Sequence, residues 1–180
     1  MKNRACMAAA MVLLAAAAAG CGGSGSSQPA GQPTAAAAAP AFETKWLRGL
    51  FADDIRAAVG KAGLTCKGPN LENRTNVWLC ESGTPLVTYQ LTFYGSTPAK
   101  IEYLHAVVGQ SGAAKTDAPL HLFTVLAGLH FDGGDPAQAR DWLAKTLEAG
   151  GTTEIGPAKY KLAGDPNRRV FDIKASGSEW

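Results

Sequence analysis

The stretch Pro85–Gly95, PLVTYQLTFYG, predicts the fold class because its apolar and polar residues alternate. Successive side chains of a β-strand point to opposite faces, so one face of this strand is apolar and the other is polar. The apolar set is Val87, Tyr89, Leu91 and Phe93, and the other set is Thr88, Gln90, Thr92 and Tyr94. Such a pattern is typical of an antiparallel sheet that buries one face and exposes the other.

The segment that follows, KIEYLHAVVG from Lys100, predicts the next strand of this sheet. Its residues Leu104, Ala106 and Val108 recur at every second position, so they are expected to point into the core together. Tyr103 and His105 then lie on the opposite face of the same strand.

Residues 65–80, TCKGPNLENRTNVWLC, predict a hairpin closed by a disulfide between Cys66 and Cys80. Asn70 and Asn73 supply turn chemistry, and Asn73 is the midpoint between the two cysteines. Residues equidistant from a hairpin turn face each other across the strands, close enough for a bridge. Closing a loop of about 15 residues contributes roughly 3 kcal/mol in the chain-entropy model. A catalytic or metal-binding thiol is the alternative, but the segment has no C-x-x-C pattern and no flanking His.

Three segments have apolar residues at helical spacing. The first runs from Phe42 to Gly63, the second opens at Asp117, and the third starts with Asp135 as its N-cap and Pro136 in its first turn. Strands and helices that follow each other without regular β-α-β alternation indicate an α+β fold. We expect a single domain at residues 41–180, with an antiparallel sheet whose helices pack on one face.

A weak internal echo suggests two related α-β-β units. A shift of 88 residues places Ile55 on Leu143, Val59 on Leu147, Gly63 on Gly151, Thr65 on Thr153, and Gly68-Pro69 on Gly156-Pro157. Chance similarity is the alternative, because the chain is rich in alanine and glycine.

Residues 1–20 predict a signal peptide. Lys2 and Arg4 form a short positive segment, Ala5–Ala19 form an apolar one, and small residues follow. The apolar run is about 15 residues long, whereas a membrane-spanning helix needs about 20. Cleavage before Cys21 would change the formal charge from +2 to neutral, leaving 15 Lys and Arg against 15 Asp and Glu. A neutral protein lacks the clustered basic excess that nucleic-acid binding requires.

The residues Ala18, Ala19, Gly20 and Cys21 resemble the lipobox of bacterial lipoproteins, in which a cysteine receives lipid and the chain is cut before it. The last three positions match the pattern, and Ala18 stands where Leu is usual. The resemblance covers about the first 25 residues. It implies an exported protein that is anchored to the membrane through lipid on Cys21, on the periplasmic or outer face of the bacterial cell envelope. Ordinary secretion, with cleavage in Ala17–Ala19 and a free Cys21 thiol, is the alternative.

Residues 21–40 predict a flexible linker that begins with the lipidated cysteine. The 19 residues of Gly22–Pro40 carry no charge and are almost all Gly, Ser, Gln, Pro, Thr or Ala. Such a tract cannot bury enough apolar surface to offset the entropy of ordering it. A flexible chain of this length spans about 24 Å on average, which would hold a folded domain away from the lipid surface.

Residues with catalytic or metal-binding chemistry form no recognised motif. The chain lacks G-x-x-x-x-G-K, H-E-x-x-H and G-x-S-x-G, so we expect neither an enzyme nor a cofactor. His121 and His130 are nine residues apart and would lie on opposite sides of an ideal helix, which argues against a shared metal. Asp132 and Asp135 flank two glycines, and a turn followed by a helix cap explains them better than a calcium loop.

One face of the sheet is a candidate docking surface. If Val77 and Leu79 point into the core, then Trp78 is exposed beside Gln90, and Tyr103 and His105 lie on the same face. Aromatic residues with polar groups dominate the energetics of protein interfaces. The alternative is that Trp78 packs on the disulfide and that the face binds nothing.

The sequence therefore favours a non-enzymatic, lipid-anchored envelope protein that binds another envelope component or has a structural role. The second hypothesis is a lipoprotein that binds a small ligand, and the third is a hydrolase. Ligand binding predicts a sizeable apolar cavity with a few polar groups, whereas docking predicts a filled core and an exposed aromatic patch.

Overall fold

The computed structural model describes residues 45–111 and 117–178. The predicted signal peptide, the lipid attachment at Cys21 and the linker lie outside these residues. Within them the chain forms three helices and seven strands in an α+β arrangement, which confirms the predicted fold class.

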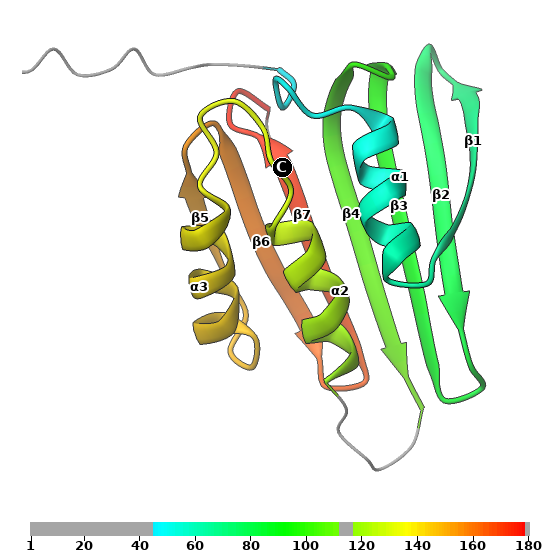
Figure 1. Ribbon diagram of the computed structural model, residues 1–180. Coiled ribbons are helices and arrows are strands. Elements are labelled where there is room, and N and C mark those ends of the chain that lie inside the picture. The colour runs from blue at the N-terminus through cyan, green and yellow to red at the C-terminus, as the bar shows by residue number, and fades with distance from the viewer. Residues whose placement is uncertain (1–44, 112–116, 179–180) are drawn as a thin grey trace, which may run out of the picture. The chain divides into compact units, whose positions relative to one another are not determined.

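The strands form a single antiparallel sheet with the order β1-β2-β3-β4-β7-β6-β5 (Figure 1). Strands β4 and β7 are distant in the sequence but pair in the middle of the sheet, while β1 and β5 are its edges. The strands are β1 Thr65–Glu72, β2 Thr75–Gly83, β3 Val87–Thr97, β4 Lys100–Gln110, β5 Gly151–Ile155, β6 Ala158–Asp165 and β7 Arg168–Ala175.

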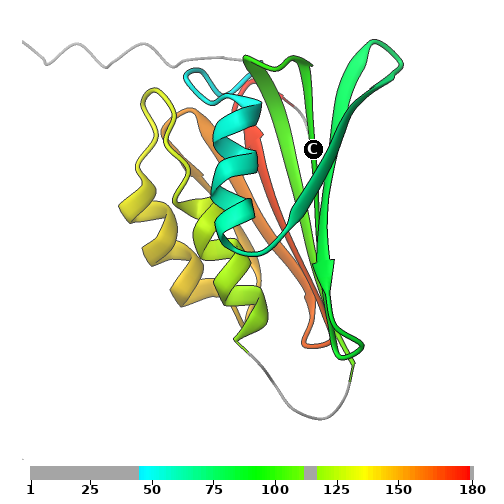
Figure 2. The same ribbon diagram turned by 45° about the vertical axis from the view of Figure 1, so that its right-hand side comes forward.

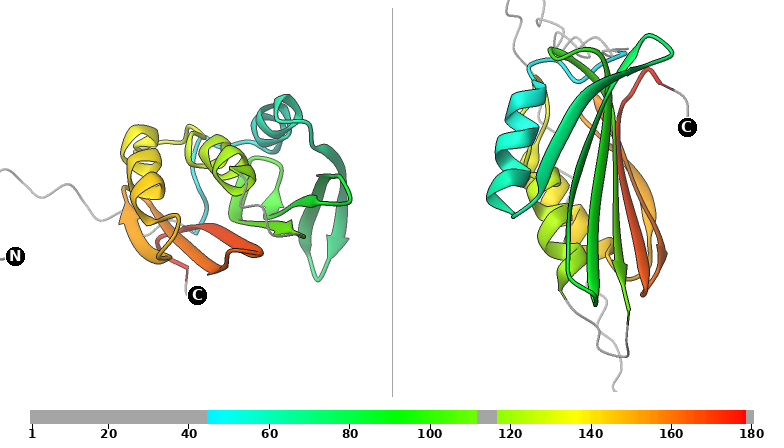
Figure 3. Two further views of the ribbon diagram at one scale, coloured as in Figure 1. Left: turned by 90° about the horizontal axis from the view of Figure 1, so that it is seen from below. Right: turned by 90° about the vertical axis from the view of Figure 1, so that its right-hand side faces the viewer.

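The helices α1 Ala52–Lys61, α2 Ala118–Ala127 and α3 Pro136–Thr146 run along the same side of the sheet (Figures 2 and 3). Aromatic contacts join two of them to β7. The ring centroid of Phe123 on α2 lies 5.2 Å from that of Phe171, and the ring of Trp142 on α3 lies 6.4 Å from it. One face of the sheet is therefore covered by helices, and we call the opposite face the open face.

The core lies between the helices and the sheet, and the strand pattern explains its composition. On β3, Leu91 and Phe93 are fully buried, while Thr88 and Gln90 on the open face are exposed, as the alternation predicts. The residues predicted to be buried on β4, which are Leu104, Ala106 and Val108, are also buried. Burying each Leu or Phe side chain stabilises the fold by roughly 1.5–3 kcal/mol.

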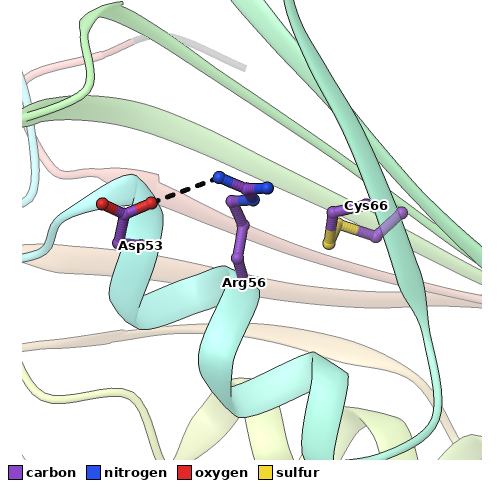
Figure 4. The surroundings of a disulfide bond; sticks show 4 residues. Asp53, Arg56 and Cys66 are labelled. Atoms are coloured by element: carbon purple, nitrogen blue, oxygen red, sulfur yellow. Dashed lines mark hydrogen bonds and ion pairs between the residues drawn. A yellow bond between two sulfur atoms is a disulfide. The ribbon is translucent and has the colours of Figure 1, made fainter.

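The hairpin of β1 and β2 has the predicted turn and the predicted disulfide. Asn73 and Arg74 form the turn and have φ of 48° and 69°, as the two-residue turn that suits twisted hairpins requires. Cys66 lies directly opposite Cys80, and the two are bonded. The bridge lies on the helix-facing side near α1, where Asp53 and Arg56 form an ion pair at 3.3 Å (Figure 4).

The predicted faces of β2 are wrong. Trp78 lies opposite Phe93 on β3 and stacks on its ring at a centroid distance of 4.9 Å, so Trp78 is only 2% exposed. Val77 and Leu79 accordingly lie on the open face and are half-buried. The sequence of residues 77–80, VWLC, is apolar throughout, so its alternation contains no information about which side faces the core.

The first helix begins later than predicted, at Ala52. The preceding residues form a connection to the sheet, in which the Leu47 amide donates to the Ile101 carbonyl at 2.7 Å. Gly49 has φ of 76°, a conformation that disfavours other residues and interrupts a helix. The apolar residues upstream of Ala52 therefore have helical spacing without forming a helix. Leu47, for example, lies outside α1 but is buried in the core.

The two Gly-Pro pairs of the internal echo lie in different settings. Gly68-Pro69 lies inside strand β1, whereas Gly156-Pro157 forms the turn between β5 and β6. The relation of two α-β-β units stays a prediction. The N-cap of α3 is confirmed, because the Asp135 side chain accepts a hydrogen bond from the Gln138 amide at 2.9 Å.

Candidate functional site

The candidate site is at the centre of the open face, where β4 and β7 pair. His105 on β4 lies directly opposite Asp172 on β7, and Tyr103 precedes His105 by two residues on the same face. Of the residues predicted for a docking face, Tyr103 and His105 therefore lie together. Trp78 is in the core, on the other side of the sheet.

Tyr103, His105 and Asp172 form a hydrogen-bonded group, which we call the Tyr-His-Asp cluster. The Tyr103 hydroxyl donates to Oδ1 of Asp172 at 2.6 Å, and Nδ1 of His105 lies 2.7 Å from the same oxygen. The Asp172 side chain is only 10% exposed although it lies on the open face, while that of His105 is 34% exposed. Hydrogen bonds to a carboxylate are short and strong, so the cluster has a fixed geometry.

The electrostatics of the cluster favour a protonated tyrosine. Burial raises the pKa of Tyr103 well above its ordinary value, and the hydrogen bond to Asp172 and the negative charge of Asp172 raise it further. The hydroxyl is therefore a hydrogen-bond donor at neutral pH, and it is poorly suited to act as a general base.

A second tyrosine extends the site towards β3. The ring of Tyr94 stacks on that of Tyr103 with a centroid distance of 5.5 Å, and burial, followed by the charge of Glu72, raises the Tyr94 pKa. Val77 on β2 is directly opposite Tyr94, so an apolar strip crosses three neighbouring strands. Both tyrosines are partly exposed, as an interface aromatic must be.

Lysines flank the cluster on its other side. The Lys174 ammonium lies 5.7 Å from the centroid of the Tyr103 ring, within the range of a cation–π contact. Lys161 is directly opposite Asp172, and Lys159 is opposite both Lys174 on β7 and Glu154 on the edge strand β5. These three lysines outnumber the carboxylates of Asp172 and Glu154, so the β6–β7 half of the site has a net positive charge.

Gln90, the remaining predicted residue, lies on the open face but away from the cluster. It is opposite Val107 and lines a separate groove that also contains Glu81, Leu86 and Arg168. The structure therefore divides the predicted docking residues among the core, the cluster and this groove.

Asp172 was missing from the sequence prediction, although a signal for it exists. In VFDIKA, residues 170–175, Asp172 and Lys174 alternate with Phe171 and Ile173, which places the charged residues on the face away from the core. The pairing of β7 with β4 is a long-range contact, so the sequence could not indicate that Asp172 meets His105.

Other residues that the sequence singled out lie outside the cluster. Asp135 is the cap of α3, and His121 and His130 are both exposed. Within residues 45–111 and 117–178, no three His, Cys, Asp or Glu side chains converge as metal ligands would. None of the helices in these two segments has the length and apolar character needed to cross a membrane.

No protein-family model matches this chain, and neither does any curated protein or solved structure with which it was compared. The class of protein is therefore defined by its architecture, an α+β domain with a seven-stranded antiparallel sheet and three helices in the described part of the chain.

Proposed function

We propose that this protein is exported, anchored by lipid on Cys21 in the bacterial cell envelope, and docks another envelope protein through its open face. It acts by binding and not by catalysis. The support for the address is the signal-like segment before Cys21, the charge-free tract after it, and a disulfide that persists in oxidising compartments.

The Tyr-His-Asp cluster is the observation that carries the docking proposal. An open sheet face in water needs no buried carboxylate, yet Asp172 is almost fully covered and accepts two short contacts. Burying a charge costs free energy unless it is paired and hydrogen-bonded. The contacts of Asp172 offset that cost, and they hold Tyr103 and His105 in fixed positions on the open face. The cluster fixes the Tyr103 ring, which avoids the entropic cost of ordering that side chain on binding.

The chemistry of the site favours as partner a folded protein surface with carboxylates next to an apolar patch. Tyr94, Tyr103 and Val77 offer apolar contact area, and the lysines of β6 and β7 favour negative charge. Tyr, Trp and Arg dominate interface hot spots, and complementary charge sets specificity and the association rate.

The docking proposal also requires that the helices leave one face free, which their position on one side of the sheet allows (Figure 3).

We propose further that the sheet consists of two related halves. In each, a helix precedes three antiparallel strands that run inward from an edge: α1 with β1–β3, and α3 with β5–β7.

Capture of partners from native membranes by chemical cross-linking tests the docking. A protein that cross-links to the wild type should be lost when Tyr103→Ala removes the exposed ring, while thermal unfolding shows that the variant is folded. Lys67→Ala, on the open face of the edge strand β1, is the control and should keep the partner. Equal capture by Tyr103→Ala and the wild type would refute docking at the cluster.

Palmitate labelling tests the anchor separately. The wild type should incorporate the label and Cys21→Ala should not, because lipid attachment requires the thiol. Equal labelling of the two proteins would show that Cys21 is not the attachment point, and it would leave the docking test unaffected.

A further inference from the structure

A groove with a volume of about 550 Å³ lies on the helical side of the domain, away from the open face. Its apolar part is formed by Ala58 of α1, Ala62 just after α1, Val125 of α2 and Leu129 just after α2. This volume is within the range of about 300–1,000 Å³ that is usual for small-molecule sites. The groove therefore has room for a short apolar chain.

Arg140 of α3 lies at the rim of this groove in a position that depends on Gly128. The Nε of Arg140 approaches the Thr124 carbonyl at 3.5 Å, and a Cβ atom at Gly128 would overlap the guanidinium group. The absence of a side chain at Gly128 thus lets the guanidinium lie across the end of α2. Within residues 45–111 and 117–178, no carboxylate forms an ion pair with Arg140.

The rest of the rim is more basic than acidic. Lys61 adds a second cation, and His121 and His130 add two exposed imidazoles. The single carboxylate is that of Asp54, which accepts a hydrogen bond from the Phe51 amide at the start of α1. A guanidinium offers several donors in a planar fork that matches a carboxylate or phosphate.

We propose that this groove binds a single-chain anionic amphiphile, with the carboxylate or phosphate head at Arg140 and the chain over Ala58 and Val125. A free fatty acid and a phosphate-bearing lipid fragment share this chemistry. The proposal is independent of the docking site, because the two lie on opposite sides of the sheet.

The test measures binding of dodecanoate, dodecyl phosphate and dodecyltrimethylammonium below their micelle concentrations, through the methyl NMR signals of Val125 and Leu129. Both anions should shift these signals saturably. The cation should bind about ten-fold more weakly or not at all, because it cannot accept charge-assisted hydrogen bonds from the Arg140 guanidinium. A preference between the anions identifies the source as a carboxylate or a phosphate.

Two pairs of variants locate the ligand. Ala58→Phe fills the groove and should abolish saturable binding of dodecanoate, while Ala57→Phe at the neighbouring exposed position should leave it unchanged. Arg140→Gln should weaken binding about ten-fold, while Arg56→Gln, on α1 outside the groove, should not. Thermal unfolding checks that each variant is folded. Equal binding of the cation, unchanged binding by folded Ala58→Phe, or no saturable shifts in the wild type would each overturn the proposal.

Discussion

Asp172 holds together the Tyr-His-Asp cluster on the open face. Its carboxylate is the common acceptor for the Tyr103 hydroxyl and a ring nitrogen of His105, so its loss removes two short contacts and leaves only the 3.2 Å contact between these two groups. The sequence indicated Tyr103 and His105 as surface residues of one strand, because side chains alternate along a strand. It could not reveal the carboxylate between them, because that depends on the pairing of β4 with β7.

Asp172→Ala should lower the free energy of unfolding by about 1–3 kcal/mol, because it removes a charged acceptor that two partly buried groups share. Asp141→Ala is the control, since it removes an exposed helical ion pair with Lys145 and should change stability by less than about 0.5 kcal/mol. Urea unfolding at neutral pH measures both. A loss in Asp172→Ala no larger than that in the control would show that the cluster adds no stability.

Tyr103 should make stability depend on alkaline pH. Burial and Asp172 raise its pKa in the folded protein, so the folded state holds this proton more tightly than the unfolded chain. That contribution is complete below the ordinary tyrosine pKa of about 10 and is lost as the pH rises from there towards the folded pKa. Urea unfolding between about pH 9 and 11 should therefore show a smaller decline in Tyr103→Phe than in the wild type. Parallel declines in the two proteins would contradict the assignment.

At the level of elements, the clearest predictions came from local patterns. Strand β3, the β1–β2 hairpin and the cap of α3 follow from alternation, turn residues and capping chemistry within short segments. The prediction of which face of β2 is buried was wrong because residues 77–80 are all apolar. The predicted start of α1 was wrong because buried residues outside a helix can have helical spacing. In both cases the deciding contact is with a strand elsewhere in the sheet.

The disulfide should stabilise the hairpin and the domain. Cys66 and Cys80 are 14 residues apart, and breaking a bridge over a loop of this size costs roughly 3 kcal/mol in the chain-entropy model. Reduction with dithiothreitol should lower the urea midpoint of the wild type. The double variant Cys66→Ser/Cys80→Ser should have the lower midpoint already and should not respond to dithiothreitol. An unchanged midpoint on reduction would mean that the bond contributes no stability.

Two glycines should respond in opposite directions to the same substitution. Gly49→Ala should destabilise, because φ is 76° and the new Cβ would lie 2.7 Å from a carboxylate oxygen of Asp132. Gly60→Ala should stabilise by about 0.5–1 kcal/mol, because Gly60 lies in α1 and its Cβ would meet nothing within 4 Å. Thermal unfolding of both variants checks this, and a gain for Gly49→Ala would contradict the account of where α1 starts.

At the level of the whole molecule, the two faces of the sheet have different surroundings. The helices cover one face and complete the core, while the opposite face, with its tyrosines, lysines and buried carboxylate, is the proposed docking surface. The fold class was predictable because it follows from the order and type of elements. The site was predictable only in part, because it combines residues of β4 and β7, and two helices lie between these strands in the sequence.

Site-specific photo-cross-linking in intact cells tests docking at the open face most directly. A photo-reactive amino acid in place of Thr92, which is directly opposite His105, should cross-link to one defined envelope protein, because it lies beside the cluster. The same amino acid in place of Ala57, exposed on α1, should not. The Thr92 product should disappear when Tyr103→Ala is added. A Thr92 probe that forms no product, or one that gives the same product as the Ala57 probe, would contradict the proposed docking face.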